Sequence, residues 1–130
     1  MILKLAAFVF GAVFLLVGIL GFFPAAAPNE MLLGIFHVNA AHNAVHLLSG
    51  AVAIACGIAG PGVARLYFRI FGIVYGLVAL LGFIQGNTLL LGLISNNMPD
   101  AWLHVAIALV SLALGFLVPA EPVKAARTVS

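Results

Sequence analysis

The chain has very few charged residues. Five of its 130 residues are basic and three are acidic, so charged side chains make up 6% of the sequence and hydrophobic ones 65%. A soluble domain carries about 25% charged residues, and this composition therefore excludes an ordinary soluble fold. The net charge is only +2 and the basic residues form no patch. Nucleic acid is therefore not an expected partner.

Cysteine pairs and the common catalytic motifs are also missing. Cys56 is the only cysteine, which excludes a disulfide framework and a paired thiolate site. The sequence contains no His-Glu-x-x-His motif and no glycine-rich phosphate loop. The apolar runs contain no central charged residue of the kind that proton-coupled pumps and ion channels use. Neither function is therefore expected. These absences favour a protein that is not an enzyme.

Long apolar runs dominate what remains. The mean hydropathy is +1.31, and runs of about 20 residues match the ~30 Å hydrocarbon core of a bilayer. Lipid offers no partners for backbone N–H and C=O groups, so the runs must be helical. We therefore expect an all-α membrane protein, with four transmembrane helices bundled in a single domain over residues 1–130. The expected spans are residues 2–23, 41–60, 67–85 and 101–118.

The basic residues predict the orientation of these spans. They all fall on one side of the expected bundle: Lys4, Arg65, Arg69, Lys124 and Arg127. We expect Arg65 and Arg69 to lie in the loop between the second and third spans. Because cytoplasmic segments are enriched in Lys and Arg, both termini are expected in the cytoplasm. The opposite loops, which carry Glu30 and Asp100, would then face outward.

The sequence contains an internal duplication. A shift of 61 residues aligns the first span with the third, and eight of the thirteen positions from Phe10 to Phe22 are identical. A shift of 58 aligns the second span with the fourth and matches Asn39 with Asn97 and His46 with His104. Two tandem helical hairpins are therefore expected, related by an axis along the membrane normal.

The expected hairpins cover residues 1–61 and 62–119. Residues 25–27 resemble a signal-peptide cleavage site. The duplication instead places the first span in the mature fold, since the third span is its copy.

The small residues Gly72 and Gly76, four positions apart, predict a close contact between helices.

Histidines are the most informative polar residues of the chain. His42 and His46 are four residues apart, which places them on one face of a helix. The duplication puts His104 at the same depth as His46, and Asp100 in the position equivalent to His42. His37 has no such counterpart, because Ser95 takes its place.

Imidazole is the commonest metal ligand in proteins. We therefore predict a transition-metal site at the outer ends of the second and fourth helices. Its ligands would be His42, His46 and His104, completed by Asp100 or His37. Three histidines and a carboxylate suit Zn, Cu or Fe.

Other readings of the histidines stay open. A b-type haem held between His46 and His104 would indicate electron transfer. Alternatively, the histidines only form hydrogen bonds, and the chain is a structural subunit of a larger membrane complex or a homo-oligomer. A role in sensing pH is also compatible with histidine.

The histidine motifs resemble those of a known family. The string Asn39-Ala-Ala-His42-Asn43-Ala-Val-His46, followed later by Trp102-Leu-His104, resembles a bacterial four-span family catalogued as domain of unknown function 4383. The resemblance implies a small protein of the bacterial inner membrane with four helices. It brings no established activity or ligand.

Overall fold

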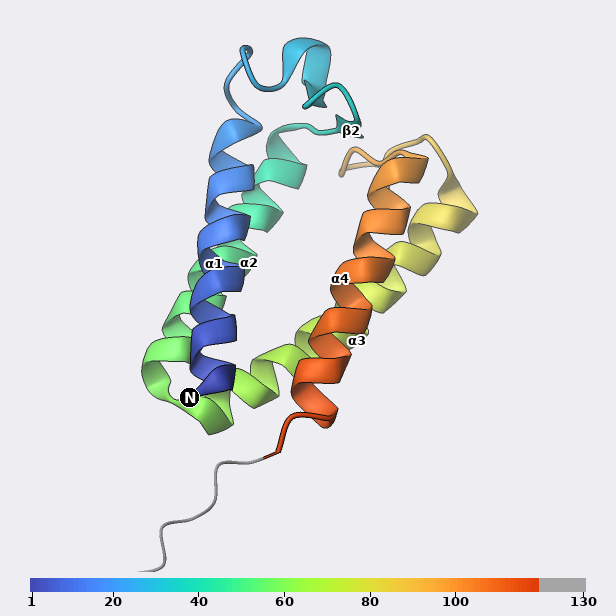
Figure 1. Cartoon of the computed structure of the whole chain (residues 1–130). Coiled ribbons are helices and arrows are strands. Elements are labelled where there is room, and N and C mark those ends of the chain that lie inside the picture. The colour runs from blue at the N-terminus through green and yellow to red at the C-terminus, as the bar shows by residue number, and fades with distance from the viewer. Residues whose placement is uncertain (120–130) are drawn as a thin grey trace, which may run out of the picture.

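The computed structural model describes residues 1–119, and within them the chain forms four α-helices (Figure 1). These are α1 (Ile2–Leu20), α2 (Ala40–Ala59), α3 (Pro61–Gln85) and α4 (Met98–Phe116). All four are long and apolar enough to cross a membrane. The prediction of an all-α membrane protein with four spans is therefore confirmed for this part of the chain.

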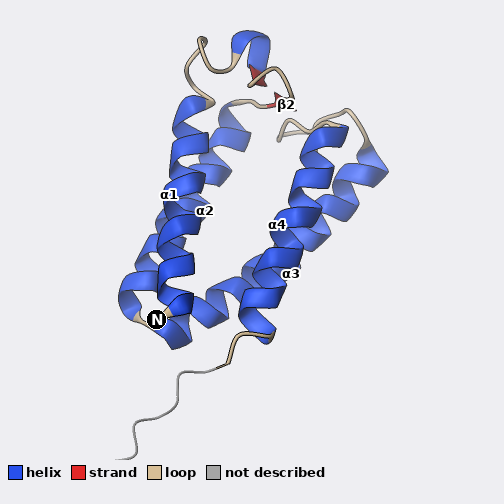
Figure 2. Cartoon of the chain, viewed as in Figure 1, coloured by secondary structure: helices blue, strands red, loops and turns tan. Residues whose placement is uncertain are grey.

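The helices pack as two antiparallel hairpins. α1 lies along α2, and α3 lies along α4. Contacts between the hairpins run mainly from α3 to α1 and α2. We call the end where α2 and α4 begin the histidine end, and the end where α1 and α3 begin the basic end. Within residues 1–119, strand occurs only in the loop between α1 and α2, at the histidine end (Figure 2).

The structure corrects the start of the third span. α2 ends at Ala59 and α3 begins at Pro61, so Gly60 alone joins them. Gly60 has a φ of 130°, a backbone conformation that glycine adopts at little cost. Arg65 and Arg69 therefore lie inside α3, and the prediction that they form a loop was wrong.

The two arginines fit in a helix because they bind the end of its neighbour. Arg69 donates from Nε to the Gly115 carbonyl at 2.8 Å, and Arg65 donates to the Val118 carbonyl. Carbonyl groups in the last turn of a helix have no partner within that helix. Long basic side chains at a helix end can also extend toward the membrane interface. Lys124 and Arg127, which also entered the orientation argument, lie outside the described residues.

Glycine permits close contact within each hairpin. A methyl group added at Gly72 would lie 2.8 Å from the Leu112 side chain and 3.0 Å from the Leu112 backbone nitrogen. Gly11, its counterpart in α1, is packed against α2 in the same way. A methyl group at Gly76 would meet only Ala108, at an ordinary 3.9 Å. The close approach of α3 and α4 thus depends on Gly72.

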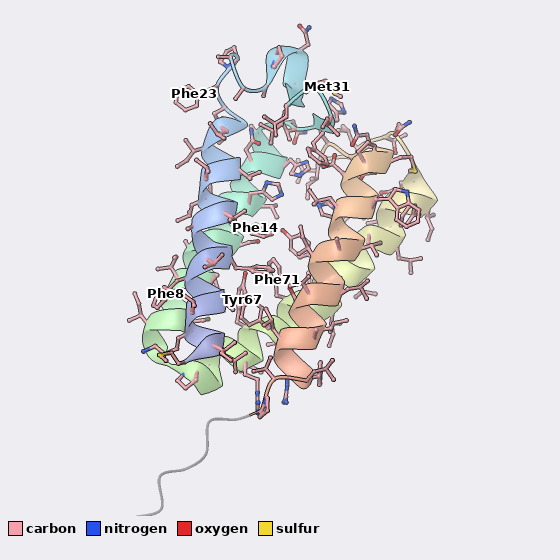
Figure 3. All side chains as sticks on the ribbon, in the orientation of Figure 1. Phe8, Phe14, Phe23, Met31, Tyr67 and Phe71 are labelled. Carbon is pink, nitrogen blue, oxygen red and sulfur yellow. The ribbon has the colours of Figure 1, made fainter. Side chains whose placement is uncertain are left out.

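Aromatic side chains of α3 project into the space between the hairpins (Figure 3). Ring centroids are 4.9 Å apart for Tyr67 and Phe71, and 4.2 Å apart for Phe71 and Tyr75. We call Tyr67, Phe71 and Tyr75 the aromatic stack. Phe14 of α1 meets Phe71 edge-on at 5.4 Å. The stack therefore packs the two hairpins against each other, on the side of the histidine end that faces the basic end.

The two loops of the histidine end contain the same kind of turn. In the first loop, β1 (Met31–Leu32) pairs antiparallel with β2 (Phe36–His37). The second loop forms the corresponding bridge between Leu90 and Ile94. Both turns pass through two successive residues with positive φ: Leu33 (54°) and Gly34 (70°), then Leu91 (53°) and Gly92 (72°). The repeated Leu-Leu-Gly tripeptide, 58 residues apart, is the sequence signal for this turn.

Candidate metal centre

The two helices that carry the buried histidines begin in the same way. Asn39 precedes α2, and its side chain accepts a hydrogen bond from the His42 backbone N–H at 2.9 Å. Asn97 precedes α4, and its side chain accepts from the Asp100 N–H at 3.2 Å. Such caps satisfy N–H groups that the helix leaves free. They also set the register at which the histidines that follow enter the bundle.

Three histidines meet at this end of the bundle. His42 and His46 come from α2 and His104 comes from α4, and all three are buried. Their candidate ligand atoms lie within 4.8 Å of one another. The ring centroid of His42 is 4.6 Å from that of His46 and 6.1 Å from that of His104. This histidine cluster therefore bridges the two hairpins.

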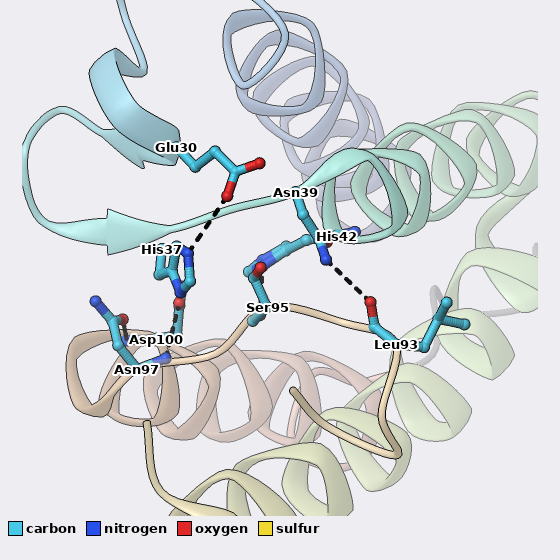
Figure 4. Close-up of polar contacts among 8 residues, drawn as sticks. All are labelled: Glu30, His37, Asn39, His42, Leu93, Ser95, Asn97 and Asp100. Atoms are coloured by element: carbon cyan, nitrogen blue, oxygen red, sulfur yellow. Dashed lines mark hydrogen bonds and ion pairs between the residues drawn. The ribbon is translucent and has the colours of Figure 1, made fainter. Parts of the chain in front are cut away.

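The environment of His42 fixes its tautomer. The Nδ1 atom of His42 lies 2.8 Å from the Ser95 carbonyl oxygen, in a buried contact across the hairpins (residues in Figure 4). A carbonyl oxygen can only accept, so Nδ1 is the donor in this contact. Metal-binding histidines commonly donate their other ring N–H to a backbone carbonyl in this way.

His46 and His104 have equivalent surroundings. Phe14 meets the His46 ring edge-on at 5.4 Å, and Tyr75 meets the His104 ring edge-on at 5.3 Å. The Nδ1 atoms of both histidines are buried and have no hydrogen-bond partner among residues 1–119. A buried polar atom without a partner costs about 1–3 kcal/mol. A ligand that pairs with these atoms would remove that cost.

The other two candidate ligands lie apart from this group. Asp100 is buried, and its carboxylate accepts from the Asn97 N–H at 3.3 Å, which completes a capping box at the start of α4. His37 is partly exposed in β2, with Nε2 3.7 Å from a carboxylate oxygen of Glu30 (Figure 4). The structure therefore brings three of the five candidates together, and gives Asp100 and His37 contacts of their own.

Two parts of the site were missed by sequence reasoning. The Ser95 carbonyl carries no sequence signal, because every residue has a carbonyl group. The aromatic pair of Phe14 and Tyr75 did have a signal, since the two residues match under the shift of 61.

The family model described as Domain of unknown function (DUF4383) matches residues 4–117. The chain belongs to this family. The match includes every residue of the histidine cluster and confirms the resemblance stated from the motifs. No curated protein and no solved structure matches the chain.

In this DUF4383 protein the cluster offers a set of three buried imidazoles. Metal–nitrogen bonds of about 2.0–2.1 Å place the ligand nitrogens of one ion roughly 3.3–4.2 Å apart. The separations of up to 4.8 Å in the cluster would therefore close through small side-chain movements. Imidazole suits Zn, Cu and Fe, and three protein ligands leave a coordination position for a further group.

Proposed function

We propose that this membrane protein binds a transition-metal ion, Zn, Cu or Fe, through His42, His46 and His104. The observation that carries the proposal is the convergence of three buried imidazoles, with ligand atoms within 4.8 Å of one another. Polar side chains at membrane depth are costly and point to function. The oriented His42 ring and the unpartnered Nδ1 atoms of His46 and His104 within residues 1–119 add support.

The same proposal places the metal on the outer side of a bacterial plasma membrane, with both termini in the cytoplasm. Lys4 lies in the first turn of α1, and Arg65 and Arg69 lie within the first three turns of α3, at the basic end. The histidine cluster lies toward the opposite end. The positive-inside rule assigns a basic end to the cytoplasm.

A metal ion suits the cluster better than haem b. Bis-histidine haem would need the flat porphyrin between His46 and His104. The His42 ring lies near both, with centroids 4.6 Å and 6.1 Å away. A compact ion uses all three rings, whereas a porphyrin would have to displace one of them.

Elemental analysis of protein purified without a metal-affinity tag tests the proposal. We expect about one metal ion per chain, and its loss in His46→Ala and His104→Ala. His37→Ala is the matched control, because His37 lies outside the cluster, near Glu30, and its variant should keep the metal. A metal-free wild-type protein would contradict the proposal. A Soret band would indicate haem instead, and a colourless, metal-free protein with a co-purifying partner would indicate a structural subunit.

A further inference from the structure

Two lateral cavities lie between the hairpins. One, the α2–α3 groove, has a volume of about 480 Å³, and the other, the α1–α4 groove, has about 390 Å³. The wall of the larger groove includes Leu66, Ile70 and Val74, whose side chains are exposed on the outside of the bundle. Because these helices span a membrane, the groove opens toward lipid. His46 lines both cavities.

The duplication relates the two grooves. Each residue that lines the α1–α4 groove has its counterpart, by the shifts of 61 and 58, in the lining of the α2–α3 groove. Val13 corresponds to Val74 in this way, and Val110 corresponds to Val52. The smaller groove is therefore an internal comparison for the larger one.

The matched positions differ in polarity. Ser49 in the α2–α3 groove corresponds to Ile107 in the other, and Tyr75 corresponds to Phe14. The Ser49 and Tyr75 hydroxyl oxygens lie 3.5 Å apart. The α2–α3 groove is also lined by His104, whose counterpart His46 lines both grooves. Contact with lipid chains alone requires none of these polar groups.

The polar groups indicate the ligand chemistry. Hydroxyl and imidazole groups can donate hydrogen bonds, and none of the described residues lining this groove is charged. They therefore suit a neutral molecule with a carbonyl acceptor and an apolar body. The volume falls within the range of small-molecule sites, about 300–1,000 Å³. The three residues of the aromatic stack line the groove, and aromatic side chains favour contact with a flat ring.

We propose that the α2–α3 groove binds a membrane-dissolved molecule of the quinone class. Its carbonyl group would lie at His104 and the hydroxyls of Ser49 and Tyr75, and its apolar tail would leave toward the lipid past Leu66. The groove recognises the carbonyl through hydrogen bonds and the tail through burial of apolar surface. The hydroxyls of Ser49 and Tyr75 take no part in the proposed metal site, whereas His104 belongs to both sites.

Binding of decylubiquinone to the full chain in lipid nanodiscs, measured by calorimetry, tests the assignment. Decylbenzene, which has the chain but no carbonyl, should bind at least about tenfold more weakly, since loss of a buried hydrogen bond is of that order. Ser49→Ala and Tyr75→Phe should each weaken decylubiquinone binding by about tenfold for the same reason.

Two matched variants locate the site. Val52→Phe should block the α2–α3 groove, and Val110→Phe, at the equivalent position in the α1–α4 groove, should leave binding unchanged. Equal binding of the two probes would overturn the proposal, as would unchanged binding in both Ser49→Ala and Val52→Phe. Circular dichroism confirms that each variant folds. The metal content of the same samples tests the metal proposal separately.

Discussion

Asn39 and Asn97 each cap their own helix and bind the loop of the other hairpin. Asn39 donates from Nδ2 to the Leu93 carbonyl at 2.9 Å (Figure 4). Asn97 donates from Nδ2 to the Ile35 carbonyl, also at 2.9 Å. The donors are 58 residues apart, and so are the acceptors. The exchange is reciprocal, as a twofold relation between the hairpins requires.

Replacing Asn39 by Asp separates these two roles. Aspartate keeps the oxygen that caps α2 and loses the Nδ2 donor, so we expect the free energy of unfolding to fall by about 0.5–1.5 kcal/mol. Asn39→Ala should cost about 1 kcal/mol more, because the cap is lost too. Unfolding in mixed detergent micelles measures both. Equal stability of the two variants would show that the cap contributes nothing.

Gly72 and Gly76 provide a second test, on one helix. Gly72→Ala should destabilise the protein by about 1–3 kcal/mol, because the new methyl group overlaps Leu112. The methyl group of Gly76→Ala has room, so this substitution should leave the stability of the protein unchanged or raise it by up to about 1 kcal/mol through helix propensity. Thermal unfolding of the two variants side by side gives the comparison. Changes of the same sign and size would contradict the close approach at Gly72.

Metal binding should stabilise the folded protein. At a free metal concentration of 100 times Kd, the gain in unfolding free energy is about 2.7 kcal/mol. We expect this gain with the metal identified by elemental analysis, and its reversal by a chelator. His104→Ala should abolish the gain and His37→Ala should preserve it. A gain that persists in His104→Ala would place the metal elsewhere.

Cysteine labelling tests the orientation. In a Cys56→Ser background, Leu91→Cys places a thiol in an exposed loop at the histidine end, and Gly62→Cys places one at the basic end, where the backbone has open space. A membrane-impermeant maleimide added to intact cells should label position 91 and leave position 62 unlabelled until the membrane is opened. The reverse pattern would invert the proposed topology.

The sequence predicted those features that depend on the length and alignment of the chain. Apolar runs located the helices because only helices of that length satisfy their backbone in lipid. The duplication placed His46 and His104 at equivalent depth, and the structure brings both into one cluster. The position of Asp100 in the sequence matched that of His42, but its carboxylate turns to the Asn97 N–H.

Other features could not be predicted from the sequence because they depend on tertiary contacts. Arg65 and Arg69 suggested a loop by their charge, and only the carbonyl groups at the end of α4 explain why a helix accommodates them. The orientation of His42 depends on a backbone carbonyl of the opposite hairpin. Composition carries no information about such a partner.

The joining of both hairpins in one chain has an evolutionary consequence. In a dimer of identical hairpins, any substitution appears twice, so the two lateral grooves must stay alike. A single chain removes that constraint, and Tyr75 can gain a hydroxyl while Phe14 keeps its hydrocarbon ring. Gly60, the single residue between α2 and α3, is therefore the link that allows one chain to carry two different grooves.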